Sequence, residues 1–139
     1  MLAEVFWGSI LVLATVLVHA LGTVVALSVL RSMYRPSMGH LGYGLLISGL
    51  VVGMFLVSLL DAALWAFAYV AVGALADFET ALYFSMVTFT TLGYGDIGLG
   101  PEWRLLASFE GANGVIMFGW TTALVVTYVQ RLAGTHTSS

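Results

Sequence analysis

Charge is what this sequence lacks most. Charged residues make up 8% of its 139 residues, whereas they make up about 25% of a soluble globular domain. Hydrophobic residues account for 60%, and the mean hydropathy is +1.03. Because so few charges cannot cover the surface of a water-soluble fold, the composition predicts a membrane protein with one domain at most.

Cysteine and lysine are missing altogether. The absence of cysteine excludes disulfides and thiolate metal sites, and a net charge of −3 offers no basic surface, so we expect no nucleic-acid partner. We expect no enzymatic activity either, because there is no paired acid–base cluster, nucleophile elbow or phosphate loop followed by lysine. The bases are Arg31, Arg35, Arg104 and Arg131, and the acids are Glu4, Asp61, Asp77, Glu79, Asp96, Glu102 and Glu110.

Long apolar runs are what the sequence has instead. Residues 5–30 carry no formal charge, and as a helix they would be about 39 Å long, enough to cross a hydrocarbon core of about 30 Å. Residues 42–72 form a second run that only Asp61 interrupts, and residues 103–130 form a third. We therefore predict three transmembrane helices. Trp65 and Tyr69 fit an aromatic belt at the membrane interface.

A fourth apolar piece, residues 78–90, is too short to cross, at about 20 Å. Asp77 can cap its start, and Glu79 in the first turn suits the helix dipole. The polar, glycine-rich segment that follows, residues 91–96, reads Thr-Leu-Gly-Tyr-Gly-Asp. Because irregular backbone at membrane depth is tolerated only inside protein or along a water-filled path, we predict a re-entrant loop that lines such a path.

The backbone of this loop suits a dehydrated cation. Gly93 and Gly95 can adopt positive φ at little cost, and their alternation with Leu92 and Tyr94 lets successive carbonyls point to one side. The Thr91 hydroxyl can add a ligand, and the partly negative end of the short helix also favours a cation. One loop cannot surround an ion and the chain has no internal repeat, so we expect several chains around a symmetry axis.

The segment Thr91-Leu-Gly-Tyr-Gly-Asp96 resembles the selectivity filter of potassium channels, with leucine where valine is commonest. Residues 81–85 with Thr88 and Thr90 are similar to that family's pore helix. Trp103-Arg104-Leu105 resembles the start of the inner helix of that family. The lower part of this helix in small bacterial members is similar to Gly114, Phe118-Gly119 and Thr122-Ala123. The resemblance covers residues 43–131. It implies an all-α membrane protein that assembles as a homotetramer around a central pore.

The resemblance also implies a role for each matching residue. Potassium would be held by the carbonyls of Thr91, Leu92, Gly93 and Tyr94 and by the Thr91 hydroxyl, with Gly95 and Asp96 completing the filter. Filter support would come from Tyr83 and Phe84, which would brace the filter tyrosine, and from Thr88 and Thr90. Gly114 would be the inner-helix hinge, and Phe118, Gly119 and Thr122 would belong to the hinge and cavity region. No cofactor is expected beyond potassium ions, and membrane lipids are the other expected partners.

The sequence departs from the family at Val87, where some members carry a glutamate that pairs with the filter aspartate. Glu110 either replaces that brace from behind the filter or is a hydrogen-bonded structural acid, because buried carboxylates in membranes are costly. Asp61 falls at a similar depth. It either shares a proton with Glu110 or reaches the outer interface.

The first apolar run is an addition to the two-helix pore. It carries His19 but no ladder of arginines, so it is not a voltage sensor. His19 is either a pH sensor or a packing residue with a hydrogen bond. Gly8, Ser9, Gly22 and Thr23 are candidate points of close helix approach around the pore.

The arginines predict orientation. Arg31, Arg35 and Arg131 share one side, which the positive-inside rule makes cytoplasmic, and only Arg104 lies on the other. The N-terminus would then be outside and the C-terminus cytoplasmic in a multi-pass protein of the cell membrane. The predicted organisation is an N-terminal helix and cytoplasmic loop (1–40), a pore domain (41–132) and a short cytoplasmic tail (133–139).

Three alternatives to a potassium-selective channel stay open. A non-selective cation channel would usually show a changed filter tyrosine or second glycine, and both are intact. A subunit of a potassium uptake transporter would need four linked loops with degenerate filters. A non-conducting accessory subunit of a larger channel would have no need of an intact filter.

Overall fold

The computed structural model describes the backbone of residues 2–35 and 38–134, and side chains as far as Arg131. This part of the chain is helical and contains no strand. Its helices are α1 (Leu2–Met33), α2 (His40–Ala71), α3 (Phe78–Phe89) and α4 (Arg104–Gly134). Of the predicted tail, residues 135–139 lie outside the described residues.

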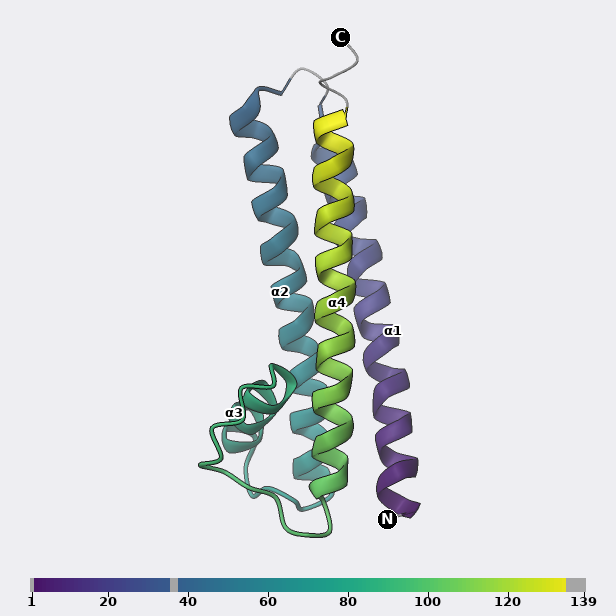
Figure 1. Ribbon diagram of the computed structural model, residues 1–139, viewed down its shortest axis with the longest axis vertical. Helices are drawn as coiled ribbons and strands as arrows, with labels where there is room; N and C mark the ends of the chain where they lie inside the picture. Colours follow the sequence, from purple (N-terminus) through teal and green to yellow (C-terminus); the bar gives the residue numbers. More distant parts are fainter. Residues whose placement is uncertain (1, 36–37, 135–139) are drawn as a thin grey trace.

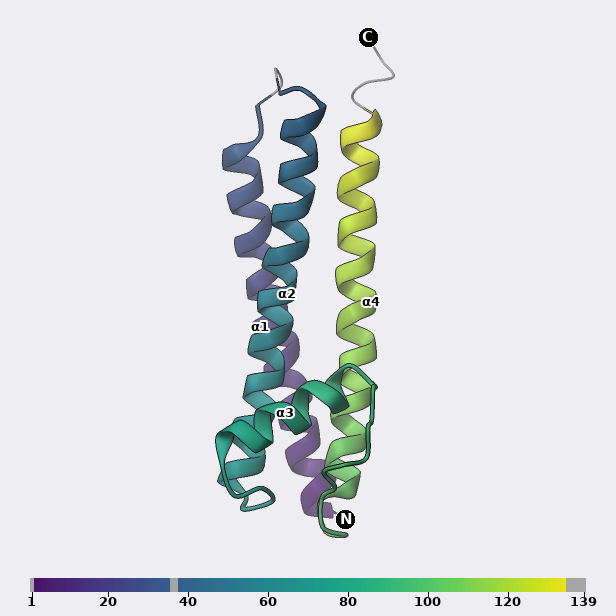
Figure 2. The ribbon, with the colours of Figure 1, turned by 90° about the vertical axis from the view of Figure 1, so that its left-hand side faces the viewer.

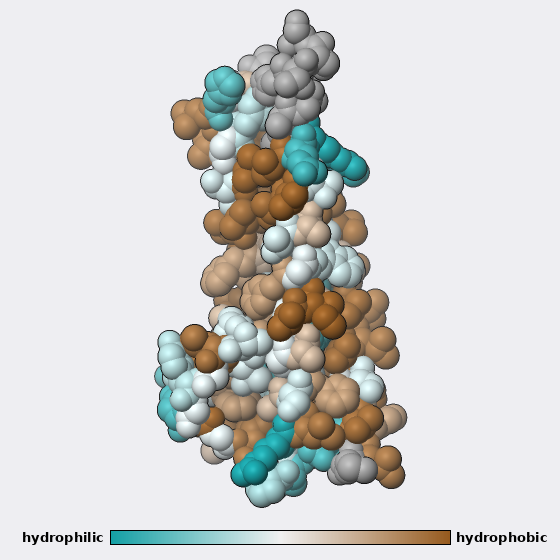
Figure 3. Space-filling view, in the orientation of Figure 1, coloured by the Kyte–Doolittle hydropathy of each residue, from teal (hydrophilic) through white to brown (hydrophobic). Residues whose placement is uncertain are grey.

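Three of these helices are long and apolar enough to cross a membrane, which confirms the predicted spans: Leu2–Met33, His40–Ala71 and Arg104–Arg131. They stand side by side, with α1 and α4 running in the same direction and α2 running against them (Figures 1 and 2). Apolar atoms cover most of the visible length of the bundle, and hydrophilic atoms gather towards its two ends (Figure 3). The chain is a multi-pass membrane protein.

The short helix α3 lies across the end of the bundle where the N-terminus is found, and the chain after it returns to that same end (Figure 2). Its start is fixed as predicted, because the Asp77 carboxylate accepts a hydrogen bond from the Thr80 amide at 2.9 Å. The same bond holds the pKa of Asp77 below its ordinary value, since it favours the charged form.

Two buried clusters hold the bundle together. One lies where α3 meets the long helices and is built around Trp65, Tyr69, Phe89, Leu106 and Met117. The other lies farther towards the C-terminal end and contains Leu30, Leu50, Met54 and Val57. The interfacial belt predicted for Trp65 and Tyr69 is therefore wrong: both are fully buried. Each ring can lie inside because its polar atom has a partner, and the Trp65 indole donates to the Thr15 hydroxyl at 3.0 Å.

Small residues bring α1 close to its neighbours, as predicted for Gly8 and Gly22. A Cβ atom on Gly8 would lie 2.9 Å from the Phe109 ring, and one on Gly22 would lie 2.4 Å from a Val57 methyl group. The expectation for Ser9 is wrong, because Ser9 is exposed and donates to the Val5 carbonyl of its own helix.

Of the described glycines, Gly114 leaves the least room for a side chain, at the place where α4 meets the end of α3. A Cβ atom on Gly114 would lie only 1.9 Å from the carbonyl oxygen of Phe89. No side chain fits there without moving backbone. Gly114 therefore lets α4 pass directly against the last turn of α3, and so fixes the position of the segment that leaves α3.

Candidate functional site

The segment that follows α3 is anchored by its first amides. The Leu92 amide donates to the Val87 carbonyl at 2.9 Å and the Gly93 amide to the same oxygen at 3.2 Å. The Thr91 amide donates to the Thr88 carbonyl at 2.9 Å. These bonds satisfy carbonyls that the last turn of a helix otherwise leaves open, so they tie the segment to the C-terminal end of α3.

Every second residue of this segment has a left-handed backbone. The φ angles are 59° at Thr91, 56° at Gly93 and 77° at Gly95. The predicted positive φ of the two glycines is confirmed, and glycine adopts it freely. Thr91 is different, because it is the one non-glycine residue of the described chain with positive φ. For a β-branched residue this conformation is an outlier that costs on the order of 1–3 kcal/mol, and such strain clusters at functional sites.

The carbonyls of residues 91–95 form a row of free acceptors. Among the described residues, no hydrogen bond ends on any of them, and the whole segment is exposed. Alternation of left-handed and ordinary backbone allows successive carbonyls to point towards one side. Carbonyl oxygens arranged in this way can replace the water ligands of a metal cation.

The far end of the segment is held by a tyrosine of α3. The Tyr83 hydroxyl donates to the Asp96 carboxylate at 2.7 Å. This bond lowers the pKa of Asp96 because it favours the carboxylate, and it raises the pKa of Tyr83. Sequence reasoning expected Tyr83 to brace Tyr94 and missed its bond to Asp96. The available signal was Tyr83 itself, on the helix position one turn before Val87.

Glu110 lies behind α3, and the hydrogen-bonding partner of Asp96 is Tyr83 rather than Glu110. The Glu110 side chain is fully buried; one carboxylate oxygen accepts from the Tyr69 hydroxyl at 2.6 Å and the other is hydrogen-bonded to Ser85. The alternative expectation of a hydrogen-bonded structural acid is confirmed. Glu110 thus joins α4 to α2 and α3. Phe84 packs edge-on against Tyr69 at 5.3 Å in the same place.

One hydroxyl of this network lies close to two oxygen atoms. The Ser85 hydroxyl lies 2.7 Å from the Ala62 carbonyl and is also bonded to Glu110, yet a hydroxyl has one hydrogen to donate. If Ser85 donates to Ala62, the contact with Glu110 needs a hydrogen on the carboxyl group. A protonated Glu110 satisfies every member of the network.

Asp61 is buried between the long helices, so neither expectation for it holds. Its Oδ2 atom lies 2.7 Å from Nδ1 of His19, and both side chains are fully buried. The other ring nitrogen of His19 lies 3.2 Å from the Thr121 hydroxyl. The three spans α1, α2 and α4 therefore meet at His19, which agrees with its prediction as a hydrogen-bonded packing residue.

The remaining predicted residues lie on α3 and α4 around the same segment. Phe118 and Thr122 are exposed on α4, and the Phe118 ring packs edge-on against Phe89 at 5.7 Å. Thr122 donates to the Phe118 carbonyl at 2.8 Å, and Gly119 is exposed beside them. Thr90 donates to the Met86 carbonyl, and Thr88 is half-buried.

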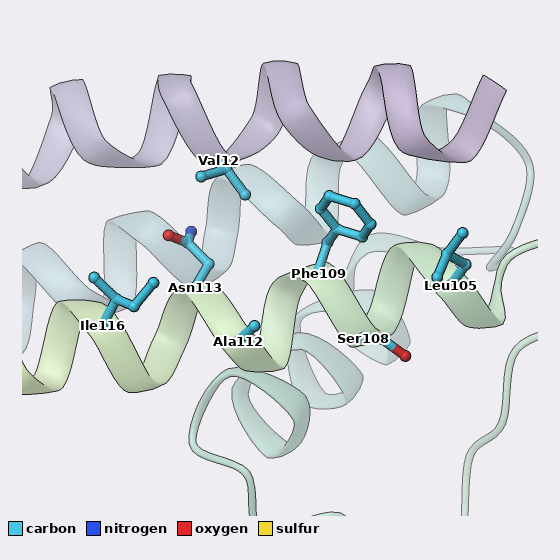
Figure 4. A pocket seen from close by; sticks show the side chains of 7 residues that line it. All are labelled: Val12, Leu105, Ser108, Phe109, Ala112, Asn113 and Ile116. Atoms are coloured by element: carbon cyan, nitrogen blue, oxygen red, sulfur yellow. The ribbon is translucent and has the colours of Figure 1, made fainter. Parts of the chain in front are cut away.

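A cavity of about 400 Å³ opens between α1 and α4. Its walls are almost wholly apolar, and the Asn113 side chain points from α4 towards α1 and Val12 (Figure 4). Neither atom of the Asn113 carboxamide has a partner among the described residues. No group of three or more histidine, cysteine, aspartate or glutamate side chains that could hold a metal ion occurs in the described part of the chain.

Comparison with known proteins agrees with this geometry. A family described as "Ion channel" matches residues 44–131, well over half of the chain. The chain therefore belongs to this ion channel family. No curated protein and no solved structure matches it.

Proposed function

We propose that the chain is the subunit of a potassium-selective channel that conducts passively through residues 91–96. The observation that carries the proposal is the left-handed backbone at Thr91, Gly93 and Gly95, in an exposed segment anchored to α3. Carbonyls of Thr91 to Tyr94, with the Thr91 hydroxyl, would take the place of the hydration shell of potassium.

The distribution of charge supports a path for cations. Five of the seven acids, Glu4, Asp77, Glu79, Asp96 and Glu102, belong to the end of the bundle where residues 91–96 lie. Acidic groups around a pore mouth raise the local concentration of cations. Arg31, Arg35 and Arg131 belong to the opposite end, which supports a cytoplasmic C-terminus and an extracellular filter entrance.

The exposure of the filter segment supports a homotetramer. Leu92 is 55% exposed and Tyr94 is 66% exposed on the single chain, and irregular backbone cannot face lipid. Four copies around an axis would cover these side chains and turn the carbonyl row towards a shared pore. The α3 helix and residues 91–96 would then form a re-entrant loop. The exposed α4 face with Phe118 and Thr122 would line the central pore below this loop.

A pair of glycine variants tests the role of this backbone. Neither Gly95 nor Gly98 has an atom within 4 Å of an added Cβ, but only Gly95 has positive φ, at 77°. Gly95→Ala should therefore strain the filter and abolish potassium selectivity or current in reconstituted vesicles, whereas Gly98→Ala should keep both. Equal behaviour of the two variants, with wild-type selectivity, would contradict the proposal.

A further inference from the structure

A second cavity lies between the C-terminal ends of α1 and α4. Its volume is about 210 Å³, smaller than the about 300–1,000 Å³ of pockets for drug-sized ligands, so it suits a single headgroup. Two arginines from different helices, a phenol and a threonine hydroxyl line it, together with two leucines. These residues are Leu27, Arg31, Leu124, Thr127, Tyr128 and Arg131.

Among the described side chains, neither Arg31 nor Arg131 forms a salt bridge. The salt bridge that the structure gives, within residues 2–35 and 38–134, joins His19 to Asp61 and involves neither Arg31 nor Arg131. A guanidinium group binds phosphate oxygens through two parallel hydrogen bonds. Two such groups that line one cavity therefore favour an anion with several oxygen atoms.

The cavity lies at the depth of lipid headgroups. A helix of 32 residues such as α1 is about 48 Å long, longer than the hydrocarbon core of about 30 Å. The last turns of α1 and α4, which carry Arg31 and Arg131, therefore extend into the interfacial region. Basic pockets between membrane helices at this level bind anionic headgroups.

An apolar groove continues from this cavity along α4. It has a volume of about 470 Å³ and shares Leu124 and Thr127 with the cavity. Its other lining residues are Ile116, Trp120 and Ala123. A basic cavity that opens into an apolar groove matches a molecule with an anionic head and a hydrocarbon tail.

The groove is not on the face of α4 assigned to the pore. Thr127 follows Phe118 by nine residues, which is about two and a half helical turns. Thr127 and Phe118 therefore point to opposite sides of α4. A molecule in the groove would therefore leave the proposed pore open.

We propose that this cavity binds an anionic phospholipid, with the phosphate between Arg31 and Arg131 and an acyl chain along the groove. The lipid would link the end of α1 to the end of α4. The proposal needs the chain to sit in a membrane, and it does not depend on which ion the chain conducts.

Native mass spectrometry of the full chain, extracted from bilayers of mixed phosphatidylglycerol and phosphatidylcholine, tests the proposal. The wild-type protein should retain phosphatidylglycerol in preference to phosphatidylcholine. In the double variant Arg31→Gln/Arg131→Gln, the amount of bound phosphatidylglycerol should fall by about tenfold or more. Arg35→Gln removes the same charge close to the same end but outside the cavity, so it should retain the lipid as the wild type does.

Three results would overturn the proposal. Equal loss in Arg35→Gln would indicate diffuse attraction to an anionic surface, and equal retention of phosphatidylcholine would mean that the phosphate charge is not recognised. Competition by soluble glycerol phosphate at matched concentration would assign the cavity to a free phosphate ester. If the double variant does not fold, Arg31→Lys keeps the charge and loses the paired hydrogen bonds, so it should show a partial loss of lipid.

Discussion

Nδ1 of His19 and Oδ2 of Asp61 lie 2.7 Å apart in the interior of the bundle, where neither side chain is exposed. The pair joins α1 to α2, and Thr121 extends it to α4. It shows how α1 is fixed to the part of the chain that the family match covers, residues 44–131.

Removal of one member of this pair should be costly. His19→Ala leaves the Asp61 carboxylate buried without its partner, so we expect a loss of about 3–5 kcal/mol of stability. Leu17→Ala on the lipid-facing side of α1, where Leu17 is 64% exposed, should change stability far less. Unfolding of the purified protein in detergent with increasing denaturant measures both. The double variant His19→Leu/Asp61→Leu should recover most of the loss, and failure to recover any would mean that the pair is not the cause.

Gly114 should tolerate no side chain. Gly114→Ala drives a methyl group into the Phe89 carbonyl, so α4 and the end of α3 must separate, and we expect a loss of about 1–3 kcal/mol or more. Gly49→Ala is the matched control, because Gly49 is exposed on α2 and an added Cβ meets no atom within 4 Å. That change should be neutral or stabilising by up to about 1 kcal/mol. Thermal unfolding of both variants tests this prediction. Equal melting temperatures for Gly114→Ala and Gly49→Ala would contradict it.

Glu110 should act as a neutral hydrogen-bonding group. Glu110→Gln keeps a donor for Ser85 and an acceptor for Tyr69, so it should keep the fold and the current. Glu110→Ala leaves both hydroxyl groups without this partner, at about 1–3 kcal/mol for each buried group. The prediction is tested by measuring the current and the thermal stability of Glu110→Gln and Glu110→Ala. A loss of function in Glu110→Gln as large as in Glu110→Ala would mean that the charge is required.

The bond between Tyr83 and Asp96 predicts a dependence on pH. Because the bond lowers the pKa of Asp96, its contribution is complete above the ordinary pKa of an aspartate, about 3.9, and is lost as the pH falls through the lower folded-state value. Tyr83→Phe should raise the pKa of Asp96 and move the loss of current in acid to higher pH. Tyr34→Phe makes the same chemical change at the other end of the bundle, so its acid profile should match the wild type. Superimposable profiles for Tyr83→Phe and the wild type would contradict the role of this bond.

The sequence was enough for the elements and for part of the site. Long apolar runs predicted the three spans, Asp77 predicted the start of α3, and Gly93 and Gly95 predicted the positive φ of their segment. These features depend on local chemistry: the length of an apolar run, a capping side chain, and the lack of a Cβ atom.

Contacts between helices could not be predicted in the same way. His19 and Asp61 are far apart in the sequence, and their pairing depends on how α1 and α2 are rotated about their axes. The periodicity of a helix identifies a face but not the residue opposite, which is why Asp61 was expected elsewhere. The left-handed backbone of Thr91 was not predicted for another reason, because threonine disfavours this conformation and the bonds to α3 hold the segment in it.

The proposed function is tested most directly by the reversal potential of the purified chain in planar bilayers, with potassium on one side and sodium on the other. If the carbonyls of residues 91–94 replace the hydration shell of potassium, the reversal potential should lie close to the potassium equilibrium potential. A reversal at zero voltage with equal concentrations of the two ions would show equal permeation, and it would contradict a potassium-selective filter.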